Sequence, residues 1–163
     1  MNETKSSEST LARLQHVVPI AIAFSFLFGG KWNFLHLNDP ILRTAFWEIL
    51  GTLITASGLL LAVLARKHLG KYWSGIITLK EGHRLIRTGP YRFARHPIYT
   101  GFLVAAFGSA VCLGKERGIY AVLLMGIAYV LKIRKEEKIL ISQFGEEYLI
   151  FQQEVKALIP RVL

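Results

Sequence analysis

A block of histidine, tyrosine, arginine and proline residues stands directly before an apolar stretch of this chain. The block runs from Gly89 to Gly101 and reads Gly-Pro-Tyr-Arg-Phe-Ala-Arg-His-Pro-Ile-Tyr-Thr-Gly. A second polar group follows, with the acidic pair Glu136-Glu137 and then the segment 144–148, which reads Phe-Gly-Glu-Glu-Tyr. Imidazole, guanidinium, phenol and carboxylate groups at the ends of apolar helices predict a site that holds a polar ligand.

The basic and acidic groups are expected to meet in space. If the apolar segments between His96 and Glu136 form a tight helical hairpin, both residues lie at the same end of it. Adjacent glutamates point about 100° apart on a helix, so we expect only one residue of the Glu136-Glu137 pair to face the site. A cluster with Arg and His close to an acidic one suits a zwitterionic ligand.

Other kinds of site fit the sequence less well. The chain has no His-x-x-Glu-His or Cys-x-x-Cys spacing and its five histidines are scattered, so no metal site is predicted. Gly82 and Gly89 lack the strand and helix context of a dinucleotide-binding loop. The single cysteine, Cys112, lies in an apolar run, which is typical of packing. Each polar residue alone would fit a surface role, and only their combination indicates a function.

Four stretches without Asp, Glu, Lys or Arg must position these groups. They are residues 14–30, 49–65, 97–114 and 118–131. A membrane span needs roughly 20 apolar residues, with about 17 as the lower limit, and the fourth stretch reaches this only with its flanking residues. A soluble bundle of this size could not cover four helices that are apolar all round. The prediction is an all-α, polytopic membrane protein with about four transmembrane helices, in a single domain over residues 1–163 with a disordered lead-in at 1–10.

The distribution of positive charge predicts how these helices lie in the membrane. The net charge is +9, and fourteen of the twenty Lys and Arg residues fall in segments 66–97 and 132–163. Four spans would place both segments on one side, which the positive-inside bias identifies as cytoplasmic. The basic excess is therefore assigned to topology and membrane lipids and not to nucleic acid.

Smaller features refine the expected helices. Gly101, Ala105 and Ser109 recur every four residues and predict close contact with another helix. A short turn at Gly114–Arg117 would make a tight hairpin. The fourth helix is expected to continue beyond the membrane until Gly145, and residues 146–158 to form an amphipathic cytoplasmic helix.

The same residues resemble the isoprenylcysteine carboxyl methyltransferase family, part of a wider group that includes the phospholipid methyltransferases. The resemblance covers about residues 80–160. It rests on Gly89-Pro90-Tyr91, on Arg95-His96-Pro97-Ile98-Tyr99, on Glu136-Glu137, and on the segments Phe144–Tyr148 and Ile159-Pro160. It implies an integral-membrane methyltransferase that uses S-adenosyl-L-methionine, with residues 80–160 as its catalytic and cofactor-binding half.

The resemblance also implies which residues bind the cofactor. They are His83, Arg84, Leu85, Ile86, Tyr91, His96, Pro97, Ile98, Tyr99 and Glu136. Glu136 is expected to accept hydrogen bonds from the amino group or the ribose hydroxyls, and His96 to satisfy the carboxylate. Tyr91 or Tyr99 can cover the adenine or face the sulfonium with its ring.

Two departures from the family pattern concern the methyl acceptor. Lys132 stands where the family has a proposed substrate-binding arginine, and Phe151 stands where it has a tyrosine. Lysine keeps the charge but loses the two-pronged grip on a carboxylate. The identity of the acceptor therefore does not follow from the resemblance. It is expected to be lipophilic, either an isoprenylcysteine carboxylate-like group or a lipid. A carboxylate needs no general base, whereas an amine could use Glu137 or His83; no residue is singled out as catalytic.

Two alternative functions remain at this point. The first is NADPH-dependent reduction of a sterol-like or isoprenoid alkene, because membrane reductases look similar in this C-terminal half. The second is a non-catalytic membrane module with a basic lipid-binding face, which predicts that changes at His96 and Glu136 have no consequence.

Overall fold

The computed structural model describes residues 10–29, 40–41, 44–70 and 85–159 of the 163-residue chain. Within those ranges the protein is all-α, as predicted, and its one sheet-like contact is an isolated bridge between Pro40 and Lys115. The elements are α1 (Thr10–Phe28), α2 (Ala45–Leu69), η3 (Gly89–Arg92), α3 (Pro97–Leu113), α4 (Glu116–Phe144) and α5 (Glu146–Glu154). Thr10 already belongs to α1, and the rest of the predicted lead-in lies outside the described residues.

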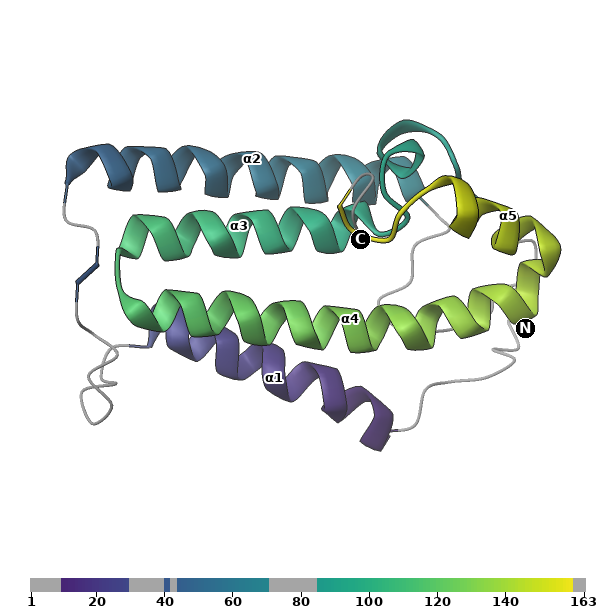
Figure 1. The fold of residues 1–163 in the computed structure, drawn as a ribbon, viewed down its shortest axis with the longest axis horizontal. Helices are drawn as coiled ribbons and strands as arrows, with labels where there is room; N and C mark the ends of the chain where they lie inside the picture. The colour runs from purple at the N-terminus through teal and green to yellow at the C-terminus, as the bar shows by residue number, and fades with distance from the viewer. Residues whose placement is uncertain (1–9, 30–39, 42–43, 71–84, 160–163) are drawn as a thin grey trace.

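The four long helices lie side by side in the order α2, α3, α4, α1 (Figure 1). At one end of this layer, Arg117 donates a hydrogen bond to the carbonyl of Gly29, and the amide of Ile41 donates to the carbonyl of Gly114 at 2.7 Å. At the other end, Lys135 donates to Gln15. The start of α1 and the polar part of α4 therefore share one end of the molecule.

The hairpin between α3 and α4 is as tight as the sequence predicts. Helix α3 ends at Leu113 and α4 begins at Glu116. Gly114 has φ +58° and ψ +31°, the left-handed conformation that favours glycine after a helix. The hairpin brings the N-terminus of α3 alongside the second half of α4, so His96 and Glu136 come to the same end.

Helices α2 and α3 approach each other so closely that glycine is required at their contacts. A Cβ atom on Gly58 would lie 2.4 Å from the backbone nitrogen of Ala105, and one on Gly108 would lie 2.4 Å from that of Thr55. The Ser109 hydroxyl is 3.4 Å from the Thr55 hydroxyl. The predicted small-residue stripe of α3 is confirmed, and α2 supplies the complementary glycines.

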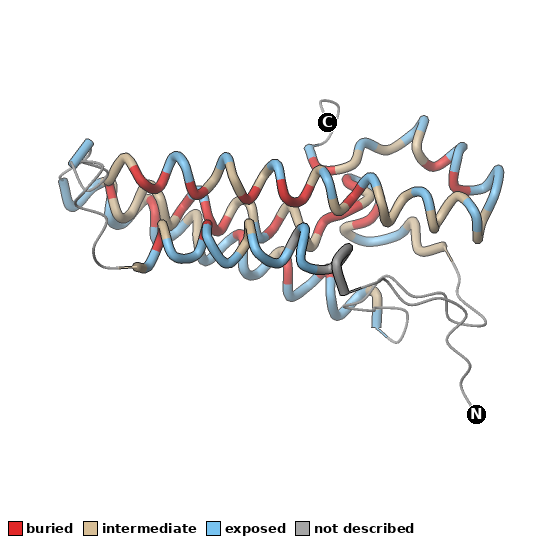
Figure 2. The backbone as a smooth tube through the Cα atoms, turned by 90° about the horizontal axis from the view of Figure 1, so that it is seen from below, coloured by how far each residue is buried: buried red, intermediate tan, exposed pale blue. Residues whose placement is uncertain are grey.

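The outward faces of the long helices are apolar and exposed (Figure 2). On α2, for example, the side chains of Phe46, Ile49, Leu53 and Leu60 are 58–64% exposed. By length and composition α2 could cross a membrane, whereas the apolar helices Val17–Phe28 and Pro97–Leu113 are shorter. Among the described residues this criterion thus supports one span clearly, fewer than the predicted four.

The C-terminal part differs from the prediction in one respect. Gly145, at φ +55°, separates α4 from α5 as expected. However, α5 ends at Glu154, and Val155 is extended, with φ −125° and ψ 132°. The helix does not reach Leu158 because the carbonyls of Lys156, Ala157 and Leu158 accept hydrogen bonds from residues 95–100.

Candidate active site

The first turn of α3 fixes the position of the central histidine. His96 is the residue before Pro97, which begins α3 and suits a first helical position because it lacks an N–H group. The amides of Arg95 and His96 donate to the carbonyls of Lys156 and Ala157, each at 2.9 Å. The imidazole of His96 is thereby buried, with 8% of the residue exposed.

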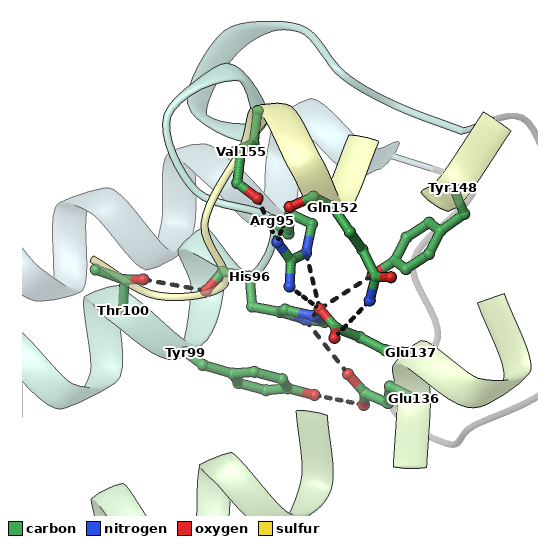
Figure 3. Close-up of polar contacts among 9 residues, drawn as sticks. All are labelled: Arg95, His96, Tyr99, Thr100, Glu136, Glu137, Tyr148, Gln152 and Val155. Atoms are coloured by element: carbon green, nitrogen blue, oxygen red, sulfur yellow. Dashed lines mark hydrogen bonds and ion pairs between the residues drawn. The ribbon is translucent and has the colours of Figure 1, made fainter. Parts of the chain in front are cut away.

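His96 lies between the two adjacent glutamates of α4 (Figure 3). Its Nδ1 atom is 3.6 Å from Glu136 Oε2, and its Nε2 atom is 3.1 Å from Glu137 Oε1. The predicted meeting of His96 and Glu136 is confirmed. Only one glutamate was expected to face the site, but both contact His96, because two flexible side chains that leave the helix in different directions reach opposite nitrogens of one ring.

Glu136 also contacts a tyrosine and a lysine. The hydroxyl of Tyr99 donates to Glu136 Oε1 at 2.6 Å. Lys132 Nζ lies 3.9 Å from the same oxygen and 5.3 Å from the centre of the Tyr99 ring. An anion, a cation, an imidazole and a π-face thus gather within one small, largely buried region.

Stacked rings continue this region into the helix layer. His96 stacks on Tyr99 with 5.7 Å between ring centres, and Tyr99 stacks on Tyr129 with 4.8 Å. Tyr129 is not among the site residues predicted from the sequence. Its position, three residues before Lys132 and seven before Glu136, places all three on one face of α4 and could have indicated it.

Tyr91 is held at the edge of the site by the C-terminal end of α2. Its hydroxyl lies 3.5 Å from the carbonyl of Ala65, and its ring stacks on His68, whose Nε2 atom is 2.9 Å from the Thr88 hydroxyl. Burial raises the pKa of Tyr91; Arg66 opposes this, and the Glu136 carboxylate adds to it.

Glu137 sits in a polar cluster of its own, hereafter the Glu137 cluster: Arg95, His96, Glu137, Tyr148 and Gln152. Its carboxylate accepts hydrogen bonds from Arg95 Nε at 2.8 Å and Gln152 Nε2 at 2.9 Å. Burial would raise the pKa of Glu137, but the hydrogen bonds and charges of His96 and Arg95 outweigh it and lower that pKa to about 2. Because such a weakly basic group takes up no proton at neutral pH, Glu137 does not suit the role of general base.

This lowered pKa predicts an acid-dependent loss of stability. The ordinary pKa of the carboxyl group is 4.5, so the stabilisation is complete above pH 4.5 and is lost as the pH falls towards 2. The shift corresponds to about 3 kcal/mol. Denaturant unfolding in detergent at pH 6 and pH 3 should show about 2 kcal/mol of this loss, because pH 3 lies between the two pKa values, and Glu137→Gln should flatten the dependence. An equal loss in both proteins would contradict the assignment.

The other predicted site residues are placed as follows. His96, Tyr99, Lys132 and Glu136 lie close together as described above, whereas Tyr91 contacts Ala65 and His68 of α2. Pro97 is buried and Ile98 half-buried in the first turn of α3, and Leu85 and Ile86 are half-buried in the segment that leads to η3. His83 and Arg84 lie outside the described residues. Besides Tyr129, the residues missing from the predicted set are Arg95, Glu137, Tyr148 and Gln152.

An apolar groove runs between α3 and α4 and ends near the site. Its volume is about 710 Å³, and it is lined on α3 by residues such as Leu103, Val104 and Phe107 and on α4 by Gly126 and Val130. Thr100, Arg134 and Leu158 also line it. The Thr100 hydroxyl donates to the carbonyls of His96, at 3.2 Å, and Leu158, at 2.8 Å. Thr100 and Leu158 thus join this groove to the backbone around His96.

Known proteins share sequence with a large part of this chain. The sequence model of the isoprenylcysteine carboxyl methyltransferase family matches residues 49–142. A protein-S-isoprenylcysteine O-methyltransferase of Saccharomyces cerevisiae is 31% identical over 158 residues, which are 95% of this chain and 64% of that protein. Methanethiol S-methyltransferase 1 of Bradyrhizobium diazoefficiens is 41% identical over 70 residues, 43% of this chain and 24% of that protein.

A solved structure shares the fold. The structure of a eukaryotic intramembrane Ras methyltransferase, an isoprenylcysteine carboxyl methyltransferase, matches with a TM-score of 0.70 at 22% identity. The match covers 91% of this chain and 53% of that one. The chain thus spans about half of the solved protein and less than two thirds of the yeast relative.

Proposed function

Because the chain belongs to the isoprenylcysteine carboxyl methyltransferase family, we propose that it transfers a methyl group from S-adenosyl-L-methionine to a lipophilic acceptor at the membrane. The observation that carries this proposal is the convergence of His96, Tyr99, Lys132 and Glu136 in one buried cluster. These residues come from two helices and meet only in the folded chain. A non-catalytic membrane module would have no need of such a cluster.

The residues of the cluster fit the chemistry of this cofactor. Glu136 is a hydrogen-bond acceptor that suits an amino group or ribose hydroxyls. Lys132 lies beside it and suits a carboxylate. The face of Tyr99 or Tyr91 suits adenine or a sulfonium. When bound, the cofactor supplies an electrophilic methyl group on a positively charged sulfur.

The protein's own contribution is to orient the reactants and exclude water. The stacked rings of His96, Tyr99 and Tyr129 and the hydrogen bonds around Glu136 fix the site before any ligand arrives. Such preorganisation is what a group transfer between two aligned reactants mainly needs. A carboxylate acceptor is already anionic and requires no base. This agrees with the lowered pKa of Glu137, which makes that residue unsuited to the role of general base.

The proposed setting is a membrane crossed by α1, α2, α3 and α4, with α5 and the site on the cytoplasmic side. The exposed apolar faces of the long helices support contact with lipid. Each of the two segments richest in Lys and Arg contributes a described residue to the site or its surroundings, Arg95 from the first and Lys132 from the second. Residues 1–163 form one domain in this proposal, and residues 80–160 form its catalytic half.

We assign the apolar tail of the acceptor to the groove between α3 and α4. This groove opens on the outer face of the helices, where lipid would lie, and ends at Thr100 and Leu158 beside the site. Lys132 supplies positive charge for the acceptor's polar end. The methyl-accepting atom can be a carboxylate oxygen or a sulfur, and the mass and fragmentation of the methylated product decide between them.

Filling the groove should weaken acceptor binding alone. No atom lies within 4 Å of a Cβ built on Gly126, so leucine at this position projects into the groove without a clash. Displacing two methylene groups of a bound tail costs about 1.6 kcal/mol, so Gly126→Leu should raise the acceptor KM about tenfold. Binding of S-adenosylhomocysteine should not change. An unchanged KM, or equal losses of both ligands, would contradict the assignment.

The proposed reaction is tested by ligand binding to the detergent-purified protein. S-adenosylhomocysteine and NADPH are titrated separately against the wild type, Glu136→Ala and His96→Ala. Micromolar binding of the former, weakened at least about tenfold in both variants by the loss of charge-assisted hydrogen bonds, is the expected result. Binding of NADPH alone would favour a reductase, and binding of neither would favour the lipid-binding module.

A further inference from the structure

The two adjacent glutamates have different surroundings. Glu136 contacts Tyr99 and Lys132, and its side chain is 20% exposed. Glu137 is 14% exposed and accepts hydrogen bonds from the other four members of the Glu137 cluster. Three of these donors reach Glu137 Oε1 and Gln152 reaches Oε2, so both oxygens are engaged within the protein. Glu136 has fewer partners and can therefore face a ligand.

We propose that Glu137 is a positioning residue, which acts on the ligand site by setting the orientation and tautomer of His96. The identity of the ligand in this inference rests on the proposed function. The geometry of Glu137 and His96 does not depend on that function. An ionised carboxylate only accepts hydrogen bonds, so His96 Nε2, at 3.1 Å from Glu137, must carry a hydrogen. In the neutral imidazole Nδ1 is then left as an acceptor.

This tautomer determines what the other side of the ring can bind. His96 Nδ1 and Glu136 Oε2 are 3.6 Å apart, beyond the range of a direct hydrogen bond. Both atoms are acceptors when the imidazole is neutral, so together they suit one group with several donors, such as a primary ammonium. The amino group of an amino-acid-like ligand is of this kind. In the other neutral tautomer, with the hydrogen on Nδ1, His96 would present a donor to Glu136 and would compete with such a ligand.

The Glu137 cluster also ties the ring to the C-terminal segment. The Arg95 guanidinium binds Glu137 and donates to the carbonyls of Gln152, at 3.3 Å, and Val155. Figure 3 shows these contacts converging from the start of α3, from α4, and from α5 with the chain that follows it. His96 cannot turn without breaking its bond to Glu137, which these elements hold in place.

Determining the tautomer of His96 by NMR tests the inference directly and needs no ligand. Long-range ¹⁵N–¹H spectra of histidine-labelled protein above the imidazole titration range distinguish the two neutral forms, and His96→Gln identifies the signals. The expected result is a hydrogen on Nε2 in the wild type and a changed pattern in Glu137→Gln. A hydrogen on Nδ1 in the wild type would overturn the inference, and this result does not depend on whether the variant folds.

The effect on the ligand is measured with S-adenosylhomocysteine. Glu137→Gln should raise its Kd roughly 10- to 100-fold, the range seen for outer partners of metal-bound histidines. The matched control is Glu154→Gln at the end of α5. This change removes the ion pair of Glu154 with Arg87 and should leave the Kd unchanged. Wild-type binding with an unaltered Kd in folded Glu137→Gln would overturn the inference. Absence of wild-type binding would instead overturn the proposed function.

Discussion

Replacing Gly58 by leucine is expected to separate α2 from α3 and to leave little folded protein in detergent. A Cβ atom at Gly58 would lie 2.4 Å from the backbone nitrogen of Ala105 and 2.6 Å from the carbonyl oxygen of Gly101. Backbone atoms cannot move aside as a flexible side chain can. The cost should therefore exceed the roughly 1–3 kcal/mol of ordinary overpacking. Size-exclusion chromatography and thermal unfolding would measure the loss.

The control for this prediction is the same substitution at Gly126. Both glycines lie within long helices, but a Cβ on Gly126 meets no atom within 4 Å. Leucine is also a better helix former than glycine, by somewhat less than 1 kcal/mol. Gly126→Leu should therefore fold at least as well as the wild type. Equal behaviour of the two variants would show that α2 and α3 are not packed through their backbones.

Removing the side chain of Arg95 is expected to destabilise the end of the molecule that carries the site. Arg95→Ala would leave the Glu137 carboxylate buried without its cation, and would remove the hydrogen bonds to Gln152 and Val155. Breaking a buried ion pair in this way costs about 3–5 kcal/mol. We expect a lower midpoint of unfolding, and limited proteolysis should show cleavage after α5 that the wild type resists.

A second arginine near α5 provides the matched control. Arg87 pairs with Glu154, but the two side chains are 34% and 55% exposed, and Arg87 lies over the Phe151 ring at 5.1 Å. Exposed ion pairs contribute about 0–1 kcal/mol, and an exposed cation–π contact contributes a similar amount. Arg87→Ala should therefore cost much less than Arg95→Ala. Similar losses in the two variants would show that burial of the Arg95–Glu137 pair is unimportant.

The sequence predicts much of this fold because the residues that begin and end its helices act through their own local conformation. Pro97 begins α3, and Gly114 and Gly145 end α3 and α4, each for conformational reasons that the residue itself carries. The spacing of Gly101, Ala105 and Ser109 identified the close face of α3. Its partner glycines on α2 were not recognised, since their separation of seven residues, at 51 and 58, stands out less in an apolar sequence.

The parts that could not be predicted depend on contacts between distant segments. The end of α5 at Glu154 follows from hydrogen bonds to residues about sixty positions earlier, which no local pattern encodes. Glu137 was misjudged for a related reason. Helical periodicity gives the direction in which a side chain leaves the backbone, but not where a flexible glutamate can reach. The meeting of His96 with Glu136 was predictable because the hairpin between them is short.

The hydrogen bonds from residues 95–100 to 156–158 have a consequence for biosynthesis. During translation α3 and α4 emerge before residues 156–158, whose carbonyls accept hydrogen bonds from the segment around His96. The surroundings of His96 are therefore incomplete when α3 and α4 are first made. These surroundings can be complete only after residue 158 has left the ribosome, however early the helices form. Until then, the backbone amides of Arg95 and His96 must find temporary partners in water or in lipid headgroups.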